Sequence, residues 1–477
     1  MKRFLAAAGA GLLALALVAC GGDDEDGEAT PSTSNTPAAS ADSAKPLTFD
    51  TSYGTSGVAT VPLNANTHDR FMAVTQGSDG KTYAAGFIIV GEGDQAMAVA
   101  RLTEKGALDT TFGTGGIASV NVGVNGKTGE IARAISVQSD GKIVIAGPFE
   151  KDVTAAGDAA RDTDVAVVRF DATGKPDASF GTNGVAKVDF GAGRITTGTT
   201  FVGDTSWGMG IAGGKIVVFG SKLADGADRV DTDYVIAALT SAGQPDASFG
   251  TGGKTVVDVS KVSDNPRNLL VESGGKIVAS GYSNVDGVVQ PVLIRVDGTG
   301  KLDTSFGTNG TATAKVLAGV TEAYSVTPQG SNYILAGYGR GADTAEKVDM
   351  VVYRFTGTGT LDTSFGEGGV FRLDIAKEDD RARNVMVLPD GRILALGSGK
   401  KDAANVDAMV VLLSKDGAPV TGFGDGGKII TDLGGPVDAW YGVTLSADKK
   451  YVLLAGYKGT DANSAGNDDA VVAKLLL

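Results

Sequence analysis

Cysteine and histidine are almost absent from this sequence, and both absences narrow its chemistry. Among 477 residues there is one cysteine, Cys20, and one histidine, His68. This scarcity excludes a disulfide framework, a zinc site built from cysteine and histidine, and any histidine-based catalysis that does not use His68. Basic residues are also few, because 42 lysines and arginines stand against 56 acidic residues, for a net charge of −14. We therefore expect no nucleic-acid partner.

The chain begins with two basic residues and a short apolar segment. The apolar run from Phe4 to Val18 is too short for a comfortable membrane span of ~20 residues and is typical of a secretory signal. It leads into Leu-Val-Ala-Cys, ending at Cys20, which resembles the cleavage site of bacterial lipoproteins. The resemblance implies that residues 1–19 are a lipoprotein signal peptide and that Cys20 carries lipid. The alternative is an ordinary cleaved signal in which Cys20 is incidental.

Residues 20–46 comprise Cys20 and a segment rich in glycine, serine, threonine, proline and acid, with no apolar periodicity. Such a segment cannot bury enough surface to fold, so we predict a disordered acidic linker. Cys20 is followed by Gly21 rather than by aspartate, and in lipoproteins this implies the outer membrane. The expected location is the bacterial outer membrane, on its periplasmic or its cell-surface side, with the lipid anchor as the membrane contact.

Residues 47–477 are built from one repeated pattern. The sequence LDTSFGTNG at Leu302 has seven versions, at intervals from 57 residues (Phe249 to Phe306) to 69 residues (Phe180 to Phe249). A second pattern, DGKIVIAG ending at Gly147, and a third, DVAVVRF ending at Phe170, recur in step with it. Repeats in step predict one continuous repeat architecture rather than the three domains that the length alone would suggest.

Each repeat is predicted to form four strands that make one sheet. In the second repeat these strands cover residues 117–122, 132–138, 142–146 and 164–170. The last two are continuous apolar runs, which are expected when a sheet is covered on both faces. Asp-Gly and Gly-Gly pairs between the second and third strands predict two-residue hairpins. Four-stranded antiparallel units repeated radially make a β-propeller. We predict an all-β fold with seven blades over residues 47–477, and six or eight blades are the alternatives.

The paired LDTSFGxxG and DGKIVxAG patterns resemble the delta-60 repeat, a β-propeller repeat of bacterial secreted and surface proteins. The resemblance covers residues 49–477. It implies a propeller fold and secretion, and it attaches no catalytic residue to the repeat. The seventh copy departs from the pattern, because Val420 replaces its aspartate and Gly422 its serine. That edge is therefore a candidate for the place where the ring closes.

The repeated aspartate and phenylalanine are predicted to be structural. An aspartate followed by a small hydroxylated residue and glycine typically caps a turn, and an active site would need one copy rather than six. The phenylalanine is expected between blades, where an aromatic side chain buries a large area. Basic residues late in the fourth strand are expected to pair with the aspartates. These aspartates are Asp50, Asp109, Asp177, Asp246, Asp303 and Asp362.

Ligand binding is expected on the face that carries the connections of variable length. Variable loops on a rigid scaffold are the usual place for binding. An acid stands near the start of the second strand of every repeat, and an arginine or tryptophan follows several of these acids. The predicted binding face comprises Asp69, Glu130, Asp204, Trp207, Asp264, Arg267, Glu322, Asp380, Arg383, Asp438 and Trp440. In a structural interpretation the acids cap strand ends and solvate the rim. In a functional one they bind a cationic ligand, a divalent ion or a basic partner.

The expected function is non-catalytic binding or scaffolding at the cell envelope by a monomer, with an envelope protein or glycan as the partner. No cofactor is predicted, although Ca²⁺ bound by the two longest loops is an open alternative. A carboxylate-dependent glycan hydrolase or lyase is another alternative, and would need two acids beside Trp207 or Trp440. A third is an accessory in outer-membrane protein assembly, by fold analogy alone. Joint replacement of Asp264, Asp380 and Asp438 is expected to abolish ligand capture without changing the melting behaviour.

Overall fold

The computed structural model describes residues 46–63, 68–91, 93–123, 129–150, 163–197, 200–400, 405–459 and 468–477. The predicted signal peptide, Cys20 and the predicted linker up to residue 45 lie outside these residues. The described residues belong to one compact unit, Pro37–Leu477. All regular elements of the described residues are β-strands, and no helix long and apolar enough to span a membrane is found among these residues.

The strands are β1 (Thr48–Phe49), β2 (Val58–Val61), β3 (Arg70–Gln76), β4 (Thr82–Gly91), β5 (Asp94–Leu102), β6 (Ile117–Val120), β7 (Ala134–Val137), β8 (Ile143–Glu150), β9 (Thr163–Phe170), β10 (Val185–Val188), β11 (Arg194–Thr197), β12 (Thr200–Val202), β13 (Thr205–Ala212), β14 (Lys215–Leu223), β15 (Thr232–Leu239), β16 (Lys254–Val257), β17 (Asn265–Val271), β18 (Ile277–Val285), β19 (Val288–Val296), β20 (Thr311–Thr313), β21 (Val320–Gln329), β22 (Asn332–Arg340), β23 (Asp349–Phe355), β24 (Val370–Leu373), β25 (Arg381–Val387), β26 (Ile393–Lys400), β27 (Val406–Leu413), β28 (Lys428–Thr431), β29 (Val437–Leu445), β30 (Tyr451–Gly459) and β31 (Asp469–Leu476).

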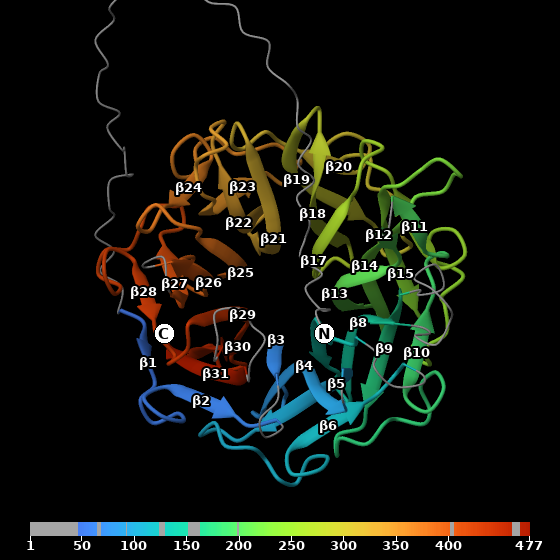
Figure 1. Cartoon of the computed structure of the whole chain (residues 1–477), viewed down its shortest axis with the longest axis vertical. Helices are drawn as coiled ribbons and strands as arrows, with labels where there is room; N and C mark the ends of the chain where they lie inside the picture. Colours follow the sequence, from blue (N-terminus) through green and yellow to red (C-terminus); the bar gives the residue numbers. More distant parts are fainter. Residues whose placement is uncertain are drawn as a thin grey trace, which may run out of the picture. The chain divides into compact units, whose positions relative to one another are not determined.

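Most strands belong to four-stranded antiparallel sheets in which the chain passes from the first strand to the fourth in order. These four-stranded units are β3–β6, β7–β10, β13–β16, β17–β20, β21–β24 and β25–β28, while β29–β31 are joined by β2. Single parallel pairs, Val289 with Val320 and Val406 with Val437, link two of these units to the next. The sheets follow one another around a centre, with first strands such as β21 innermost and fourth strands such as β24 outermost (Figure 1). This radial order of antiparallel sheets is that of a β-propeller.

The four strands of one sequence repeat do not make one sheet, contrary to the sequence prediction. The residues predicted as the first strand of the second repeat form β6, and β6 pairs with β5 of the preceding repeat. Each repeat therefore supplies the outermost strand of the sheet before it. For the same reason β2 pairs with β31, with Val58 opposite Ala473, so the two ends of the chain meet there. The closure is at this pair and not beside Val420, because the overlap between repeats leaves a gap only at the last sheet.

The hairpins between second and third predicted strands are of two kinds. Gly213 and Gly214, with φ of 57° and 83°, form the predicted two-residue loop between the paired Ala212 and Lys215. At Asp140-Gly141 the prediction is wrong by one residue. There the N–H of Gln138 donates to Lys142 O at 2.8 Å, which encloses a three-residue loop with Gly141 at a φ of 82°.

The LDTSFG pattern builds the junctions between neighbouring sheets, as predicted. Asp177 accepts hydrogen bonds from the N–H (3.0 Å) and hydroxyl (2.7 Å) of Ser179 and from Nε of Arg169 (2.8 Å). Phe180 is fully buried, with the Arg169 guanidinium carbon 4.5 Å from its ring centre. A Cβ added to Gly243, in the next sheet, would lie 2.9 Å from the Phe180 ring. The aspartate is thus a turn cap, and the phenylalanine lies between sheets.

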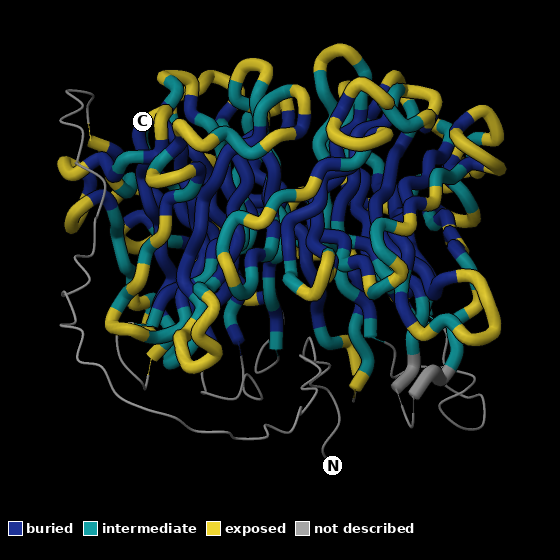
Figure 2. Tube along the Cα trace, turned by 90° about the horizontal axis from the view of Figure 1, so that it is seen from above, coloured by how far each residue is buried: buried dark blue, intermediate teal, exposed yellow. Residues whose placement is uncertain are grey.

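The hydrophobic core is divided among the spaces between sheets. Met97 and Phe112 of one sheet, for example, are buried in one cluster with Ile145 and Phe170 of the next. Buried residues occupy the middle of the described unit, and exposed residues gather in the turns on its two faces (Figure 2).

Candidate functional site

The acids of the predicted binding face are mostly buried caps rather than solvated groups. The Asp380 carboxylate accepts hydrogen bonds from the N–H of Ile375 (2.6 Å) and of Lys400 (3.1 Å). Glu130 accepts one from Val122 (2.8 Å) in the same way. The buried members, each at most 2% exposed, are Asp69, Glu130, Asp204, Asp264, Asp380 and Asp438. This geometry agrees with strand-end capping and corrects the expectation of a solvated acidic rim.

Burial also changes the titration of these acids. It is the main cause that raises the pKa of Asp204 to about 8 and those of Asp264, Asp380 and Asp438 to about 7. Because these side chains satisfy buried backbone N–H groups, their joint replacement should destabilise the fold. The expectation that replacing Asp264, Asp380 and Asp438 leaves melting unchanged is therefore withdrawn.

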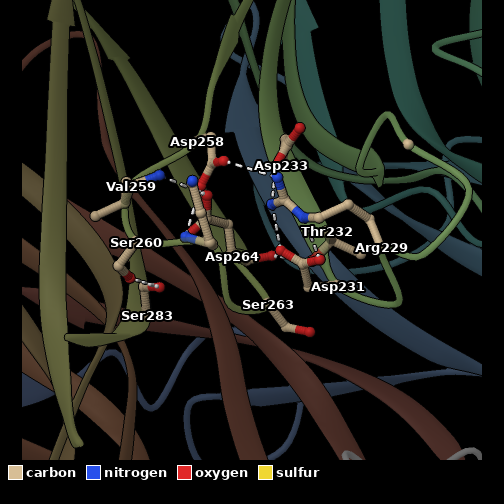
Figure 3. A network of polar contacts seen from close by, with 12 residues as sticks. Arg229, Asp231, Thr232, Asp233, Asp258, Val259, Ser260, Ser263, Asp264 and Ser283 are labelled. Atoms are coloured by element: carbon tan, nitrogen blue, oxygen red, sulfur yellow. Dashed lines mark hydrogen bonds and ion pairs between the residues drawn. The ribbon is translucent and has the colours of Figure 1, made fainter. Parts of the chain in front are cut away.

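Four of the caps belong to groups of three aspartates that could hold a metal ion, because their carboxylate oxygens lie within 4.8 Å of one another. In one group Arg229 pairs with Asp233 (3.2 Å) and Asp258 (3.0 Å) beside Asp264 (Figure 3). In a second, Arg372 pairs with Asp349. Two of the groups thus already hold one guanidinium each, which offsets one negative charge. The groups are Asp164/Asp189/Asp204, Asp233/Asp258/Asp264, Asp349/Asp374/Asp380 and Asp407/Asp432/Asp438. The Ca²⁺ alternative concerned the two long loops, residues 148–163 and 191–206; residues 151–162 of the first and 198–199 of the second lie outside the described residues.

A second set of residues arises from a one-residue bulge near the start of each innermost strand. In β13 the pairing with β14 shifts between Ser206 and Gly208, which leaves Trp207 as the extra residue. A bulge re-aims its side chain and bends the strand. Beside β7, Glu130 pairs with Phe149 and Ala134 with Ala146, which leaves one extra residue at the place of Arg133. The bulged residues are Met72, Arg133, Trp207, Arg267, Tyr324, Arg383 and Tyr441.

The bulge explains the glycine that ends each DGKIVxAG pattern. A Cβ at Gly147 would lie 1.7 Å from Ile131 O, and one at Gly220 would lie 1.8 Å from Thr205 O. These carbonyls belong to the backbone just before the bulged residue. Only glycine lets the neighbouring strand approach so closely, so the pattern carries a signal for the bulge.

The bulged residues of neighbouring sheets contact one another as alternating cations and aromatic rings. The guanidinium carbon of Arg133 lies 3.7 Å from the Trp207 ring centre, and that of Arg267 lies 4.6 Å from Trp207 and 4.5 Å from Tyr324. Arg383 continues the series, 4.8 Å from Tyr324 and 5.3 Å from Tyr441. Each contact has cation–π geometry. We call these six residues the axial ring: Arg133, Trp207, Arg267, Tyr324, Arg383 and Tyr441.

The sequence prediction found half of the axial ring. Trp207, Arg267 and Arg383 belong to it. Trp440 does not, because it is fully buried in the core and the bulged residue is the next one, Tyr441. The predicted binding face did not include Arg133, Tyr324 or Tyr441, although Arg133 and Tyr441 also follow one of its acids closely in the sequence. In most repeats the bulge comes three residues after the capping acid, and this spacing together with the glycine opposite would have identified them.

Glu322 differs from the other predicted acids. It stands two residues before the bulged Tyr324, whereas the caps stand three before. Thr321 occupies the capping position instead, and its hydroxyl accepts a hydrogen bond from the N–H of Leu317 at 3.1 Å. Glu322 is half-buried, and burial raises its pKa. It therefore lies beside the axial ring, where its charge acts on Arg267.

The arginines of the axial ring carry charge without a carboxylate partner. No carboxylate of the described residues lies within ion-pair distance of Arg133, Arg267 or Arg383. The Nε atom of each is buried and has no hydrogen-bond acceptor in the described part of the chain. Burial and the neighbouring Arg267 lower the pKa of Arg133 to about 9, so its guanidinium remains charged at neutral pH. Burial alone would raise the pKa of Tyr324, but the charges of Arg267 and Arg383 lower it.

A small cavity adjoins the axial ring. It has a volume of about 140 Å³ and is lined by Met72, Arg133, Trp207, Asn268 and Asn384, among others. This volume exceeds the ~30 Å³ share of one water molecule in the liquid several times over. Guanidinium and amide groups around a space of this size can receive one small polar group of a ligand.

Comparison with known proteins supports the fold. The family described as "Domain of unknown function (DUF5122) beta-propeller" matches residues 77–112, 138–180 and 273–306. No curated protein matches. Among solved structures, Drosophila Semaphorin 2a is 9% identical with a TM-score of 0.41, over 88% of this chain and 76% of its own. Polysaccharide lyase Uly1 is 10% identical with a TM-score of 0.42, over 85% and 90%. At such identities and TM-scores, the likeness carries no information on ligand or activity.

Proposed function

We propose that this protein is a non-catalytic binding protein, a seven-bladed propeller held by lipid at Cys20 on the bacterial outer membrane, whose ligand enters the centre at the axial ring. The proposed number of seven blades is supported by the four-stranded antiparallel units together with the one that β2 completes. The proposed anchor and location rest on the sequence before Cys20 alone. An envelope protein or glycan is the proposed partner.

The observation that carries the proposed site is the variety of the bulged residues. The LDTSFG turns repeat one structure around the ring, with the same aspartate and buried aromatic in almost every copy. At the bulge, by contrast, one backbone geometry presents methionine, arginine, tryptophan or tyrosine in different repeats. A fold that needed only closure would not require unpaired arginines there, so ligand binding accounts for them better.

The same geometry supports binding over carboxylate-dependent hydrolysis. Hydrolysis of a glycosidic bond generally uses two carboxyl groups about 5–10 Å apart. The capping acids are engaged by backbone N–H groups, and Trp440 is a core residue. Glu322 is the acid among the predicted residues that lies beside the axial ring. We therefore favour a binding site over a hydrolase for this centre.

A capture experiment tests the axial site. The lipidated full-length chain, and a variant with Trp207→Ala and Tyr441→Ala, would be incubated with detergent-solubilised envelope and the retained components compared. We expect components held by the wild type to be lost from the variant, because both side chains hold ring arginines in place. Lys105→Ala with Lys301→Ala, exposed in turns between third and fourth strands of their sheets, is the control. Equal retention by the axial variant would overturn the axial site.

The proposed anchor has a separate test. Cys20→Ser removes the only thiol that could accept lipid. We expect the variant to appear in the soluble fraction, while the wild type sediments with the outer membrane and takes up labelled palmitate. Membrane association of the Cys20→Ser chain would show that lipid at Cys20 is not the anchor.

A further inference from the structure

Three arginines of the axial ring are placed as the donors of an anion site. Arg133, Arg267 and Arg383 come from alternate inner strands, with Trp207 and Tyr324 between them. Their guanidinium groups are therefore spread around the centre rather than collected on one side. Three positive charges that lie near one another repel, and a negative charge between them would offset this repulsion.

The hydrogen-bonding of these arginines is incomplete. Arg267 is 8% exposed, and its Nη2 donates to the hydroxyls of Tyr282 (2.7 Å) and Tyr324 (3.3 Å). Arg133 donates weakly to Thr205 Oγ1 at 3.2 Å. The Nε–H groups of Arg133, Arg267 and Arg383 have no acceptor in the described part of the chain. Buried donors of this kind normally have a partner, and charged ones above all.

The geometry of the axial ring limits which ligand group could accept hydrogen bonds from these arginine N–H groups. The faces of Trp207 and Tyr324 already carry guanidinium groups, so they are poorly placed to stack on a sugar or a base. The free N–H groups lie at the edges of the guanidinium planes, and these edges bind oxyanions through parallel N–H···O bonds. The adjoining 140 Å³ cavity, which is lined by Arg133, Asn268 and Asn384 among others but not by Arg267 or Arg383, has room for one such group but not for a whole oligomer.

We propose that the axial ring binds a phosphate monoester group, with Arg133, Arg267 and Arg383 as its ligands and the rest of the ligand outside the ring. A phosphate dianion offers three oxygens to three guanidinium groups, whereas one carboxylate is matched by a single arginine fork. The inference deepens the proposed function, on which it rests. The axial ring would give an acidic protein a local positive centre for an anion.

Isothermal titration of the full-length protein with inorganic phosphate and glucose 6-phosphate tests the proposal, with sulfate and glucuronate as competing probes. We expect saturable binding of both phosphate probes, comparable binding of the sulfate dianion, and the weakest binding of glucuronate. Arg133→Gln or Arg383→Gln should each weaken phosphate binding at least tenfold. Arg340→Gln, which removes the same charge from the end of β22 away from the ring, should leave it unchanged. The affinity should fall as salt is added.

The pKa of Tyr324 provides a second measurement of phosphate binding. Bound phosphate would shield this tyrosine from Arg267 and Arg383, so its pKa should rise when phosphate is added, as followed by ultraviolet absorbance against a Tyr324→Phe baseline. Absence of phosphate binding, equal binding by the Arg133→Gln variant, or tighter binding of glucuronate would each overturn the phosphate proposal. The proposed function would survive these outcomes if envelope components still depended on Trp207 and Tyr441 for capture. It would fail with the inference if they did not.

Discussion

Two of the settings in which arginine occurs in this molecule, the junctions between sheets and the axial ring, differ in one respect. At a junction Arg169 stacks on Phe180 and also pairs with Asp177 at 2.8 Å. In the axial ring Arg133 stacks on Trp207 but has no carboxylate partner among the described residues. Both settings use an aromatic face to hold the guanidinium. Only the junction neutralises the charge within the chain.

The difference separates architecture from function. The junction recurs with the same pairing at Arg101, Arg295 and Arg354, as expected of a contact that each sheet needs for closure. The axial ring places its arginines in alternate sheets without an ion-pair partner among the described residues, and the carboxylate whose charge acts on Arg267 is that of Glu322. A buried charge without a partner is costly to the fold. Such a cost is expected where a ligand supplies the missing charge.

Breaking the junction pair should have the largest effect. Asp177→Ala leaves Arg169, which is 5% exposed, without its carboxylate and removes the cap on Ser179. We expect the free energy of unfolding to fall by about 2–3 kcal/mol, measured by urea denaturation. Asp140→Ala is the control, because its carboxylate is largely exposed and its pairing with Lys142 is on the surface; it should change stability by less than about 0.5 kcal/mol. Equal effects of the two variants would contradict the distinction.

Removing a charge from the axial ring should act differently. Arg133→Gln abolishes a stacking contact of about 1 kcal/mol but also relieves a buried charge and its repulsion by Arg267. These effects oppose each other, so we expect the unliganded variant to unfold within about 0.5 kcal/mol of the wild type. Arg169→Gln, at a junction, should destabilise the protein, because it leaves Asp177 without its arginine. A loss from Arg133→Gln as large as that from Arg169→Gln would mean that the axial ring is structural.

The sequence predicted the repeated architecture better than the centre. Residues of the turns, strands and core recur from repeat to repeat. The roles of Asp177 as a turn cap and of Phe180 as a core residue between sheets could therefore be inferred from repetition. The register of hydrogen bonds does not appear in a residue pattern, and it is the register that makes Tyr441 the bulged residue and sends Trp440 into the core. The acids misled for a related reason. A carboxylate at the end of a loop, such as that of Asp380, suggests a solvent-exposed side chain. The backbone N–H group that Asp380 binds comes within hydrogen-bond distance only when the loop is folded.

The two sets of acids should oppose each other in their response to pH. Burial raises the pKa of Asp204 to about 8 and that of Asp438 to about 7 from the ordinary 3.8, so the fold favours their protonated forms. Their stabilising contribution is complete below pH 3.8 and is lost as the pH rises through about 7–8. The turn aspartates behave in the opposite way. The hydroxyl of Thr111 is the main cause that lowers the pKa of Asp109 to about 2, so its contribution is present above pH 3.8 and is lost as the pH falls through about 2.

We expect the melting temperature to be highest between about pH 4 and 6 and lower at both pH 8 and pH 2.5, as measured by calorimetry at constant ionic strength. Asp438→Asn should lower the melting temperature at pH 5 but flatten its decline from pH 6 to pH 8. A melting temperature that rises from pH 5 to pH 8 would mean that the capping acids are ionised in the folded protein, and their burial would then have to be compensated by charges elsewhere.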